Sequence, residues 1–228
     1  QCSSANDSAI VKISKTADYM KPVEFPIVTG AQVRINFNDS TLVLDEHKPG
    51  EYVIPYKFKE NQEYTVSVTI DDKTYTANST MPQKVALDSL VTSVSPFSPY
   101  YATYPGEIFY QVTMHFTDPS MQNFYRIKIT KNDTLFNNAR DLMVTDDIYF
   151  NGRSFFYTPN YVFKSSDKVK IEFISIDKQN YLYYTTLSQA LSSTGNFSVP
   201  NNPESNFSGG ILGHFNAFSS DSIVVVIP

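Results

Sequence analysis

Hydrophobic and polar residues alternate along most of the chain with a period of two. In the first third of the sequence the alternation recurs in short segments, which is typical of half-buried β-strands. Turn residues separate these segments at HKPGE (47–51) and DDK (71–73). Six such strands predict a small antiparallel β-sandwich in this part of the chain. The segments are AIVKISK (9–15), AQVRINF (31–37), STLVLDE (40–46), EYVIPY (51–56), EYTVSVTI (63–70) and TYTANSTM (74–81).

A second series of strand-like segments follows the stretch MPQK (81–84), which marks the exit from the first unit. We therefore expect an all-β fold with two β-sandwich domains of Ig-like or prealbumin-like type. The first domain is expected over residues 1–84 and the second over residues 85–228. The segments of the second series are IFYQVTMHF (108–116), NFYRIKIT (123–130) and KVKIEFISI (168–176), with less distinct ones at LMV (142–144) and SFFYT (154–158).

One segment, DKQNYLYYTTLSQALSS (177–193), departs from the period of two. Its apolar residues recur every three or four positions, which predicts an amphipathic helix. Asp177 is suited to cap the start of this helix, and Gly195 follows its end. We expect one short helix near 178–192, packed on the second sheet, and then a polar connection leading to a C-terminal strand over 211–227.

Composition and charge narrow the class of protein. The 228 residues are 41% hydrophobic and 18% charged, which argues against a disordered chain. The formal net charge is −5 and the basic residues are scattered, so neither nucleic acid nor an anionic membrane surface is indicated as a partner. The 16 Tyr and 17 Phe favour strands. The longest purely apolar run, Ile223–Ile227, is too short for a membrane-spanning helix and is typical of a buried strand.

The single cysteine, Cys2, excludes an internal disulfide and a multi-cysteine metal site. Its place near the start of the sequence leaves three interpretations open. Cys2 is an ordinary buried thiol in a first strand, an incidental residue, or the lipid-bearing cysteine of a bacterial lipoprotein whose signal peptide has been removed. Gln1 is a poor match for the small residue that usually precedes a lipidated cysteine.

Three glycines, Gly209, Gly210 and Gly213, lie close together before the expected last strand. A phosphate-binding loop would require a following GKS or GKT and a helix N-terminus, and this stretch has neither. We expect these glycines to supply positive φ, or close backbone approach, at a corner of the chain.

The sequence offers no residue set for catalysis, a cofactor or a metal. The histidines His47, His115 and His214 show no zinc-binding spacing. Carboxylate pairs occur at expected turns and lack the alternating donors of a calcium loop. No GxSxG nucleophile elbow occurs. We therefore expect a protein that is not an enzyme and that has no cofactor.

A loop rich in proline and aromatic residues, SPFSPYYATYPGE (95–107), is the best candidate for binding. Rigid loops that carry tyrosine give a large contact area at a small entropic cost. The alternative is that these side chains pack between the two domains and hold them together. The candidate contact residues are Phe97, Tyr100, Tyr101 and Tyr104.

Three stretches of the chain carry a family resemblance. Residues 28–82 contain a Gly-Ala-x-Val opening, a Gly-x-Tyr turn and a Thr-x-Pro-like end, and this part is also similar to the prealbumin-like carboxypeptidase regulatory domain. Residues 112–129 contain Phe-x-Asp followed by Asn-Phe-Tyr. Residues 203–223, PESNFSGGILGHFNAFSSDSI, follow a terminal Ser-Asn-x-x-Gly-Gly-x-x-Gly-Tyr-Phe-x-Ala-Tyr-Ser pattern, with His214 and Phe218 in place of its two Tyr. Together these stretches resemble the Bacteroidetes family called domain of unknown function 4249.

The resemblance implies an exported, lipid-anchored protein of the outer membrane or cell surface. Such proteins are similar in context to accessory lipoproteins encoded beside TonB-dependent transporters. The family usually has a further strand before AIVKISK, with the lipoprotein cysteine upstream of that strand. The resemblance implies no enzyme activity and transfers no catalytic residue.

Our first hypothesis is a non-enzymatic envelope lipoprotein that binds a partner or nutrient ligand beside a TonB-dependent transporter. The alternative is an adhesion or envelope-structural protein. A carbohydrate-active enzyme would require two carboxylates in a cleft, and the sequence offers no such pair.

Overall fold

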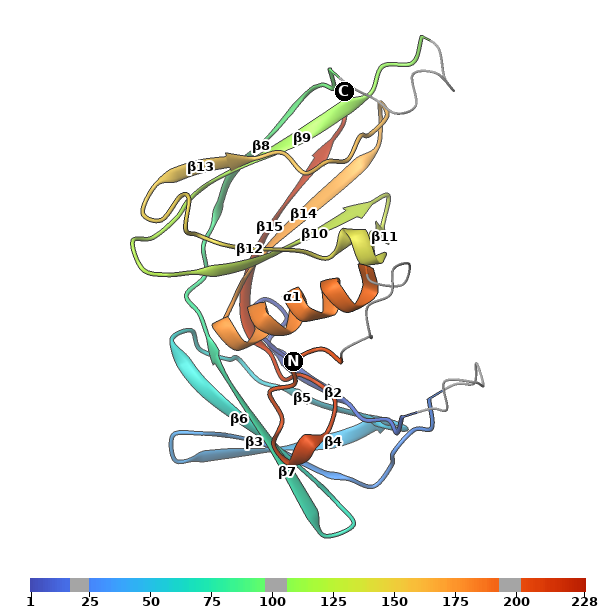
Figure 1. Cartoon of the computed structure of the whole chain (residues 1–228), viewed down its shortest axis with the longest axis vertical. Helices are drawn as coiled ribbons and strands as arrows, with labels where there is room; N and C mark the ends of the chain where they lie inside the picture. The colour runs from blue at the N-terminus through green and yellow to red at the C-terminus, as the bar shows by residue number, and fades with distance from the viewer. Residues whose placement is uncertain (17–24, 97–105, 193–201) are drawn as a thin grey trace. The chain divides into compact units, whose positions relative to one another are not determined.

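The computed structural model describes residues 1–16, 25–96, 106–192 and 202–228 (Figure 1). Within these ranges the chain forms fifteen β-strands, one α-helix and two short 3₁₀-helices. The prediction of an all-β chain with one helix is therefore confirmed. Helix α1 spans Lys178–Ser192, as the spacing of apolar residues predicts. Among the described residues, no helix has the length and apolar character needed to cross a membrane.

The chain divides into two compact units. Unit 1 consists of residues 1–83 and 176–219, and unit 2 consists of residues 84–175 and 220–228. The first change of unit lies between residues 83 and 84. The second differs from the expectation, because the helix and the glycine-rich stretch return to unit 1 and do not extend the second domain.

Unit 1 is built on a sheet whose strands follow the order β15-β1-β2-β5-β4-β3-β6-β7. Its neighbouring strands are antiparallel, except that β1 pairs in parallel with the start of β15. The strands are β1 (Cys2–Ser3), β2 (Ser8–Lys12), β3 (Gln32–Phe37), β4 (Ser40–Lys48), β5 (Glu51–Pro55), β6 (Gln62–Ile70), β7 (Lys73–Met81) and β15 (Ala217–Val226), the last of which continues into unit 2.

The period-two pattern fixes which side chains form the core of unit 1. In β3, Val33 and Ile35 point inward, and they lie opposite Val68 and Val66 of β6. The hairpin between β6 and β7 turns at Asp71 and Asp72, both with positive φ (48° and 63°). Two consecutive left-handed residues match the twist of the flanking strands. The DDK segment is therefore a hairpin turn, as predicted.

A polar network attaches helix α1 to β7. The Asp177 carboxylate caps the helix by accepting hydrogen bonds from the Asn180 backbone N–H (2.8 Å) and, through its other oxygen, from the Ser79 hydroxyl (2.5 Å). Ser79 Oγ also accepts hydrogen bonds from Asn180 Nδ2 (3.1 Å) and from the Ala217 N–H (2.9 Å). The predicted cap is confirmed, and these contacts explain why residues 176–219 belong to unit 1.

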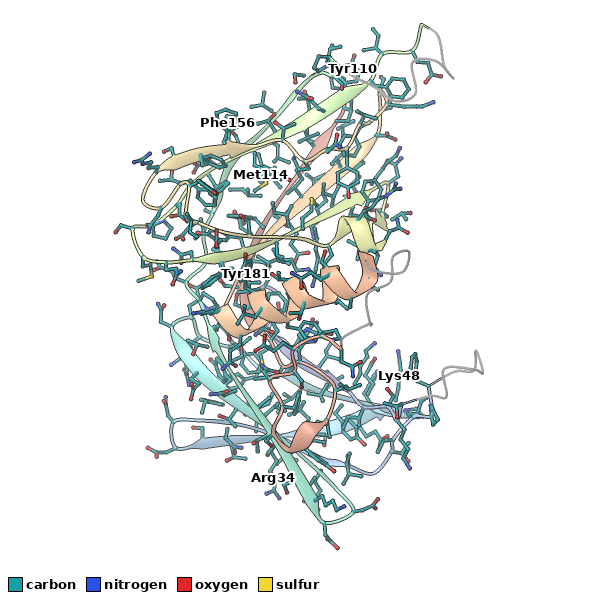
Figure 2. The ribbon with its side chains drawn as sticks, viewed as in Figure 1. Arg34, Lys48, Tyr110, Met114, Phe156 and Tyr181 are labelled. Atoms are coloured by element: carbon teal, nitrogen blue, oxygen red, sulfur yellow. The ribbon has the colours of Figure 1, made fainter. Side chains whose placement is uncertain are left out.

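Unit 2 contains strands of two sheets. One part follows the order β11-β10-β14-β15, with β12 also paired to β10, and the other follows the order β13-β9-β8. Both contribute to one buried cluster, to which β9 supplies Met114 and β10 supplies Tyr125. Figure 2 shows Met114 within unit 2 and Phe156 on the outer side of the three-stranded sheet. The strands are β8 (Leu87–Val94), β9 (Tyr110–Thr117), β10 (Phe124–Lys131), β11 (Thr134–Leu135), β12 (Met143–Asp146), β13 (Ser154–Tyr157) and β14 (Lys168–Ile176).

The last strand differs from its prediction in two ways. It begins at Ala217 and not at 211, because the preceding residues form a closed loop. Its apolar run is also not buried on both faces. Ile223 and Val225 pack against the core of unit 2, whereas Val224 and Val226 are 49% and 63% exposed.

Candidate functional site

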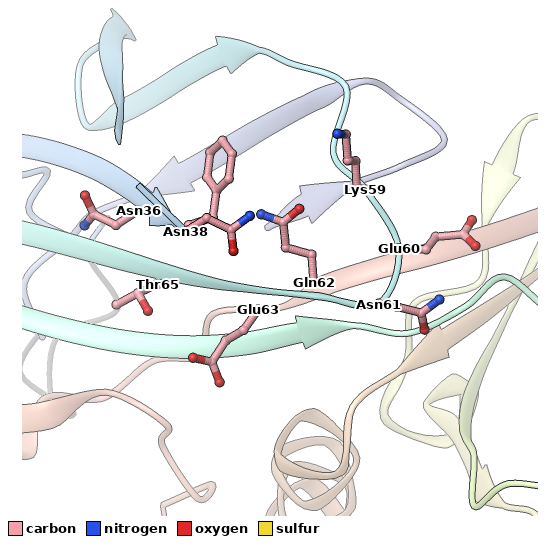
Figure 3. A pocket seen from close by; sticks show the side chains of 9 residues that line it. Asn36, Asn38, Lys59, Glu60, Asn61, Gln62, Glu63 and Thr65 are labelled. Atoms are coloured by element: carbon pink, nitrogen blue, oxygen red, sulfur yellow. The ribbon is translucent and has the colours of Figure 1, made fainter. Parts of the chain in front are cut away.

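Unit 1 carries a hollow of about 450 Å³ beside the ends of β3 and β6 (Figure 3). Most of its lining is polar, and amide side chains predominate. The lining residues are Asn36, Phe37, Asn38, Lys59, Glu60, Asn61, Gln62, Glu63 and Thr65.

Strand register and two tight turns place these side chains. Asn36 of β3 and Thr65 of β6 are cross-strand neighbours, and they point away from the core because the inward positions hold Ile35 and Val66. Asn38 and Asn61 have positive φ (47° and 58°) in the turns that border the hollow. Asparagine tolerates this conformation better than most residues, so the same turns also present amide groups.

Hydrogen bonds to the backbone of residues 59–61 hold this rim of the hollow in place. The Tyr64 hydroxyl accepts a hydrogen bond from the Lys59 N–H (2.7 Å) and donates one to the Lys59 carbonyl oxygen (3.1 Å). The Asn61 N–H donates to the Met81 carbonyl oxygen (2.7 Å). Burial raises the pKa of Tyr64, so its hydroxyl stays protonated and available as a donor. The rim is therefore set before any ligand arrives.

An aromatic cluster supports the hollow from the core side. The Phe37 and Tyr64 rings lie 5.3 Å apart between centroids, and Phe58 contacts Tyr64 edge-on at 5.1 Å. Tyr56 lies against both Phe37 (5.4 Å) and Phe58 (5.0 Å). Such packing fixes the backbone of β3 and the 59–61 rim in one arrangement.

One amide in the hollow has an unused donor. Gln62 Nε2 is buried and has no hydrogen-bond partner among the described residues. Figure 3 shows the Gln62 side chain directed toward Asn38. Asn36 Oδ1 accepts a hydrogen bond from Thr41 Oγ1 (2.8 Å), which orients that amide. A buried donor without a partner is uncommon, and this one is free to donate to an oxygen of water or of a ligand.

The lining combines four amide side chains with a few charged ones. The nine residues that line the hollow include no Cys, Ser, His or Tyr, and their hydroxyl, amino and carboxyl groups belong to Thr65, Lys59, Glu60 and Glu63. Their charges are one ammonium, Lys59, and two carboxylates, Glu60 and Glu63. Within the described ranges, no group of three or more His, Cys, Asp or Glu side chains is placed to hold a metal ion.

The sequence did not single out this hollow, and the residues that it did single out lie elsewhere. Phe97, Tyr100, Tyr101 and Tyr104 lie outside the described residues, so their proposed contact role stays a prediction. The asparagines at the turns were the one available signal for the hollow. They did not identify a site, because asparagine is common in turns for conformational reasons alone.

Cys2 lies in β1, and its side chain is fully buried in the core of unit 1. Its N–H donates a hydrogen bond to the Asn216 carbonyl oxygen (2.8 Å). Burial raises the pKa of the Cys2 thiol to about 12, so it carries almost no reactive thiolate at neutral pH. Of the three interpretations left open by the sequence, this position is that of a buried thiol in a first strand.

The glycine-rich stretch is a corner of the chain, as predicted. Gly209 and Gly210 have positive φ (74° and 72°) within a 3₁₀-helix at Ser208–Gly210. Asn206 closes the loop with two 2.8 Å hydrogen bonds: its Oδ1 accepts from the Phe215 N–H, and its Nδ2 donates to the Phe215 carbonyl oxygen. Ser205 Oγ donates to the carbonyl oxygen of Gly213 (2.8 Å).

The histidines serve as packed or exposed side chains. His214 stacks on Tyr183 with ring centroids 3.9 Å apart, and its Nε2 lies 3.2 Å from the Tyr184 hydroxyl. His115 contacts Phe156 at 5.9 Å, and His47 is exposed in β4.

The Gly-Ala-x-Val opening and the Gly-x-Tyr turn of the first family stretch lie next to each other around Glu46. Its carboxylate accepts hydrogen bonds from the N–H groups of Gly30 (2.9 Å) and Gly50 (2.8 Å). The Tyr52 hydroxyl accepts a hydrogen bond from the Ala31 N–H (2.9 Å). The Gly-Ala opening and the Gly-x-Tyr turn are therefore two halves of one hydrogen-bonded loop.

Two buried carboxylates in unit 2 were missed as a pair by the sequence reasoning. Asp118 accepts hydrogen bonds from the Tyr125 hydroxyl and from the Gly152 N–H (3.0 Å). Asp147 accepts one from the Asn123 N–H (2.7 Å). Both side chains are buried, and their donors come from the protein, so they tie the 118–123 loop to the 147–152 loop.

The comparison with protein families gives one result that spans nearly the whole chain. A family described as a domain of unknown function, DUF4249, matches residues 2–223. A search of curated proteins finds no significant match to the sequence.

Proposed function

Because the chain belongs to the DUF4249 family, whose function is unknown, we propose that it is a non-enzymatic binding component of the bacterial cell envelope. In this proposal a lipid holds it at the outer membrane or cell surface, where it assists a TonB-dependent transporter. The resemblance to Bacteroidetes accessory lipoproteins supports the location and the partner. We also propose that both units are β-sandwiches and that unit 1 is prealbumin-like.

The observation that carries the binding role is the hollow in unit 1. Its rim is fixed by the Tyr64 hydroxyl, and its lining offers several polar side chains that face one small volume. Its volume of about 450 Å³ lies within the range of small-ligand sites, and its polar lining differs from the mostly apolar lining of such sites. The four amide side chains of its lining, Asn36, Asn38, Asn61 and Gln62, favour recognition of a polar ligand.

The buried position of Cys2 bears on where the lipid is attached. A diacylglyceryl group on its sulfur would have to occupy the packed core of unit 1, next to Ala9 and Ala217. The family resemblance instead places the lipidated cysteine upstream of a further strand. We therefore propose an anchor upstream of Cys2 in the full-length protein.

Affinity purification of the tagged full-length protein from detergent-solubilised native membranes tests this function. We expect mass spectrometry to identify a TonB-dependent barrel in stoichiometric amount. A Cys2→Ala variant that stays folded by circular dichroism should remain in the membrane fraction. Recovery of the parent protein only from the soluble fraction would contradict the lipoprotein proposal.

An adhesion or envelope-structural role is the second candidate, and one observation favours it. The 147–152 loop, which Asp118 and Asp147 tie to the 118–123 loop, exposes Ile148 (67%) and Tyr149 (87%) to solvent. Rigid loops with exposed apolar side chains are suited to protein contact. Recovery from the membrane without a transporter would favour this role over the first.

A further inference from the structure

We infer that the hollow in unit 1 binds a neutral, hydroxyl-rich ligand, the terminal one or two rings of a saccharide. This inference rests on the proposed binding function and names its ligand class. Four observations carry it: the hydrogen-bonding capacity of the lining, its charge, the state of the neighbouring backbone and the size of the hollow.

The lining matches groups that both donate and accept hydrogen bonds. Each amide of Asn38, Asn61 and Gln62 presents a carbonyl oxygen beside an NH₂ group, and Thr65 adds a hydroxyl. Sugar hydroxyls have the same dual capacity, so neighbouring hydroxyls can pair with one amide. The buried Gln62 Nε2, which has no partner among the described residues, would donate to a ligand oxygen.

The charges of the lining disfavour an anionic ligand. Lys59 contributes +1, while Glu60 and Glu63 contribute −2, so the lining sums to −1. A site for phosphate or a carboxylate would concentrate Arg, Lys or backbone N–H groups. Asn78 Nδ2 already donates to Glu63 Oε2 (3.4 Å), which leaves this carboxylate partly engaged. A neutral ligand therefore fits the lining best.

The neighbouring backbone disfavours an extended peptide. β3 pairs with β4 and β6, and β6 pairs with β3 and β7, so neither strand has a free edge for strand addition. The one aromatic lining residue, Phe37, is only 9% exposed, so the hollow has no apolar pocket for an anchoring side chain. Recognition is left to polar side chains.

The size of the hollow sets the size of the ligand. A volume of about 450 Å³ lies in the lower half of the range for small-molecule sites. One or two sugar rings fill such a space, and a longer glycan would extend into solvent. The fixed rim reduces the ordering cost that a flexible loop would add on binding.

Titration of the ¹⁵N-labelled full chain, followed by NMR, tests the inference. The probes are glucose, galactose, N-acetylglucosamine, maltose and cellobiose, with glucuronate, inorganic phosphate and trialanine as comparators. We expect saturable shifts of the side-chain NH₂ signals of Asn38, Asn61 and Gln62 with at least one neutral saccharide. Shifts with only an anion or with only the peptide would overturn the neutral-ligand class. An absence of saturable shifts with all five saccharides would overturn the inference.

Two variants locate the binding without straining the backbone. Asn61→Gly removes an amide at a positive-φ position where glycine is comfortable, and Gln62→Met keeps the approximate volume without the polar atoms. Each should weaken saccharide binding by about tenfold, the effect of losing one hydrogen bond. Asp72→Gly, at another positive-φ turn outside the hollow, is the matched control and should bind as the parent does.

The outcome is separable from that of the proposed function. Saccharide binding without a co-purified barrel would retain this inference and reject the transporter role. A co-purified barrel without saccharide binding would retain the transporter role and reject this inference.

Discussion

Gly50 shows how closely one turn residue is fixed by its neighbours. Its φ is 69°, and a Cβ atom at this position would lie 2.3 Å from Ile27 Cγ2 and 2.9 Å from the Ile13 carbonyl oxygen. Gly30 has a similar φ of 72°, but a Cβ atom there would meet no atom within 4 Å. Both glycines donate their N–H to the Glu46 carboxylate. They differ in the space available for a side chain.

This pair gives a prediction for stability. Gly30→Ala should lower the free energy of unfolding by about 1 kcal/mol, the cost of a left-handed alanine. Gly50→Ala should lower it by about 3 kcal/mol or more, because the clash adds to the same conformational cost. Denaturation with urea measures both. Equal losses would show that the backbone relaxes around the new Cβ atom.

Asp118 and Glu46 are carboxylates with opposite environments. Burial raises the pKa of Asp118 above its ordinary value of 3.8, although hydrogen bonds from Tyr125 and Gly152 oppose the shift. The N–H groups of Gly30 and then Gly50 lower the pKa of Glu46 below its ordinary value of 4.5. Asp118 therefore ionises less readily in the folded protein than in the unfolded chain, whereas Glu46 ionises more readily.

The pH dependence of stability follows from these directions. The contribution of Asp118 is fully present below its unfolded pKa and is lost as the pH rises through its folded pKa. The contribution of Glu46 is present above its unfolded pKa and is lost as the pH falls through its folded pKa. NMR titration of the carboxyl carbons should give a pKa above 3.8 for Asp118 and below 4.5 for Glu46. A pKa below 3.8 for Asp118 would show that burial does not dominate there, and a pKa above 4.5 for Glu46 would contradict its hydrogen bonds from Gly30 and Gly50.

At the scale of elements, Asn206 determines the shape of the loop before the last strand. Its side chain pairs with both backbone groups of Phe215, and its Nδ2 also donates to the Asn78 carbonyl oxygen (3.2 Å). The loop contacts β7 through a bridge between Phe207 and Ala77 and through the Thr76 N–H, which donates to Ser208 Oγ (2.9 Å). The Asn206 side chain therefore helps to hold residues 205–215 against β7.

We predict that Asn206→Asp destabilises unit 1 by about 1–3 kcal/mol, because an ionised carboxylate cannot donate to the two carbonyl oxygens. Urea denaturation provides the measurement. The exposed Asn202 supplies the control, since Asn202→Asp introduces the same charge nearby and should change stability by less than about 0.5 kcal/mol. Equal effects of the two substitutions would assign the loss to charge alone.

At the scale of the molecule, unit 1 is assembled from two distant parts of the sequence. β1 pairs in parallel with the start of β15, and Phe215 and Ala217 belong to the core that also contains Val33 and Ile35. Ser79 of β7 has three hydrogen-bonding partners from residues 177–217. The first 84 residues therefore lack part of their own core and polar network.

A fragment of residues 1–84 should consequently fail to fold on its own. We expect a poorly dispersed ¹H–¹⁵N spectrum and no cooperative unfolding, whereas the full chain should show both features. Adding a peptide of residues 176–219 should increase the spectral dispersion of the fragment. A well-dispersed spectrum from the fragment alone would show that these 84 residues fold without the later segment.

Features that depend on near neighbours along the chain could be predicted from the sequence. Alternation at Val33, Ile35 and Phe37 predicted both a strand and its buried face. The turn at Asp71 and Asp72 and the cap at Asp177 were also predictable, because each rests on residues within four positions. The apolar residues spaced every three or four positions predicted helix α1 but not which of them are buried. Tyr184 is buried, whereas Leu191 is 45% exposed.

The tertiary structure alone decided the features that join distant segments. No hydrophobic periodicity in the sequence predicts three of these features. They are the return of residues 176–219 to unit 1, the parallel pairing of β1 with β15, and the burial of Asp118 beside Tyr125. The hollow gathers side chains from the end of β3 and from the approach to β6. The physical reason is that local conformation is set by φ, ψ and nearby hydrogen bonds, whereas long-range pairing is set by burial summed over surfaces that meet only after folding.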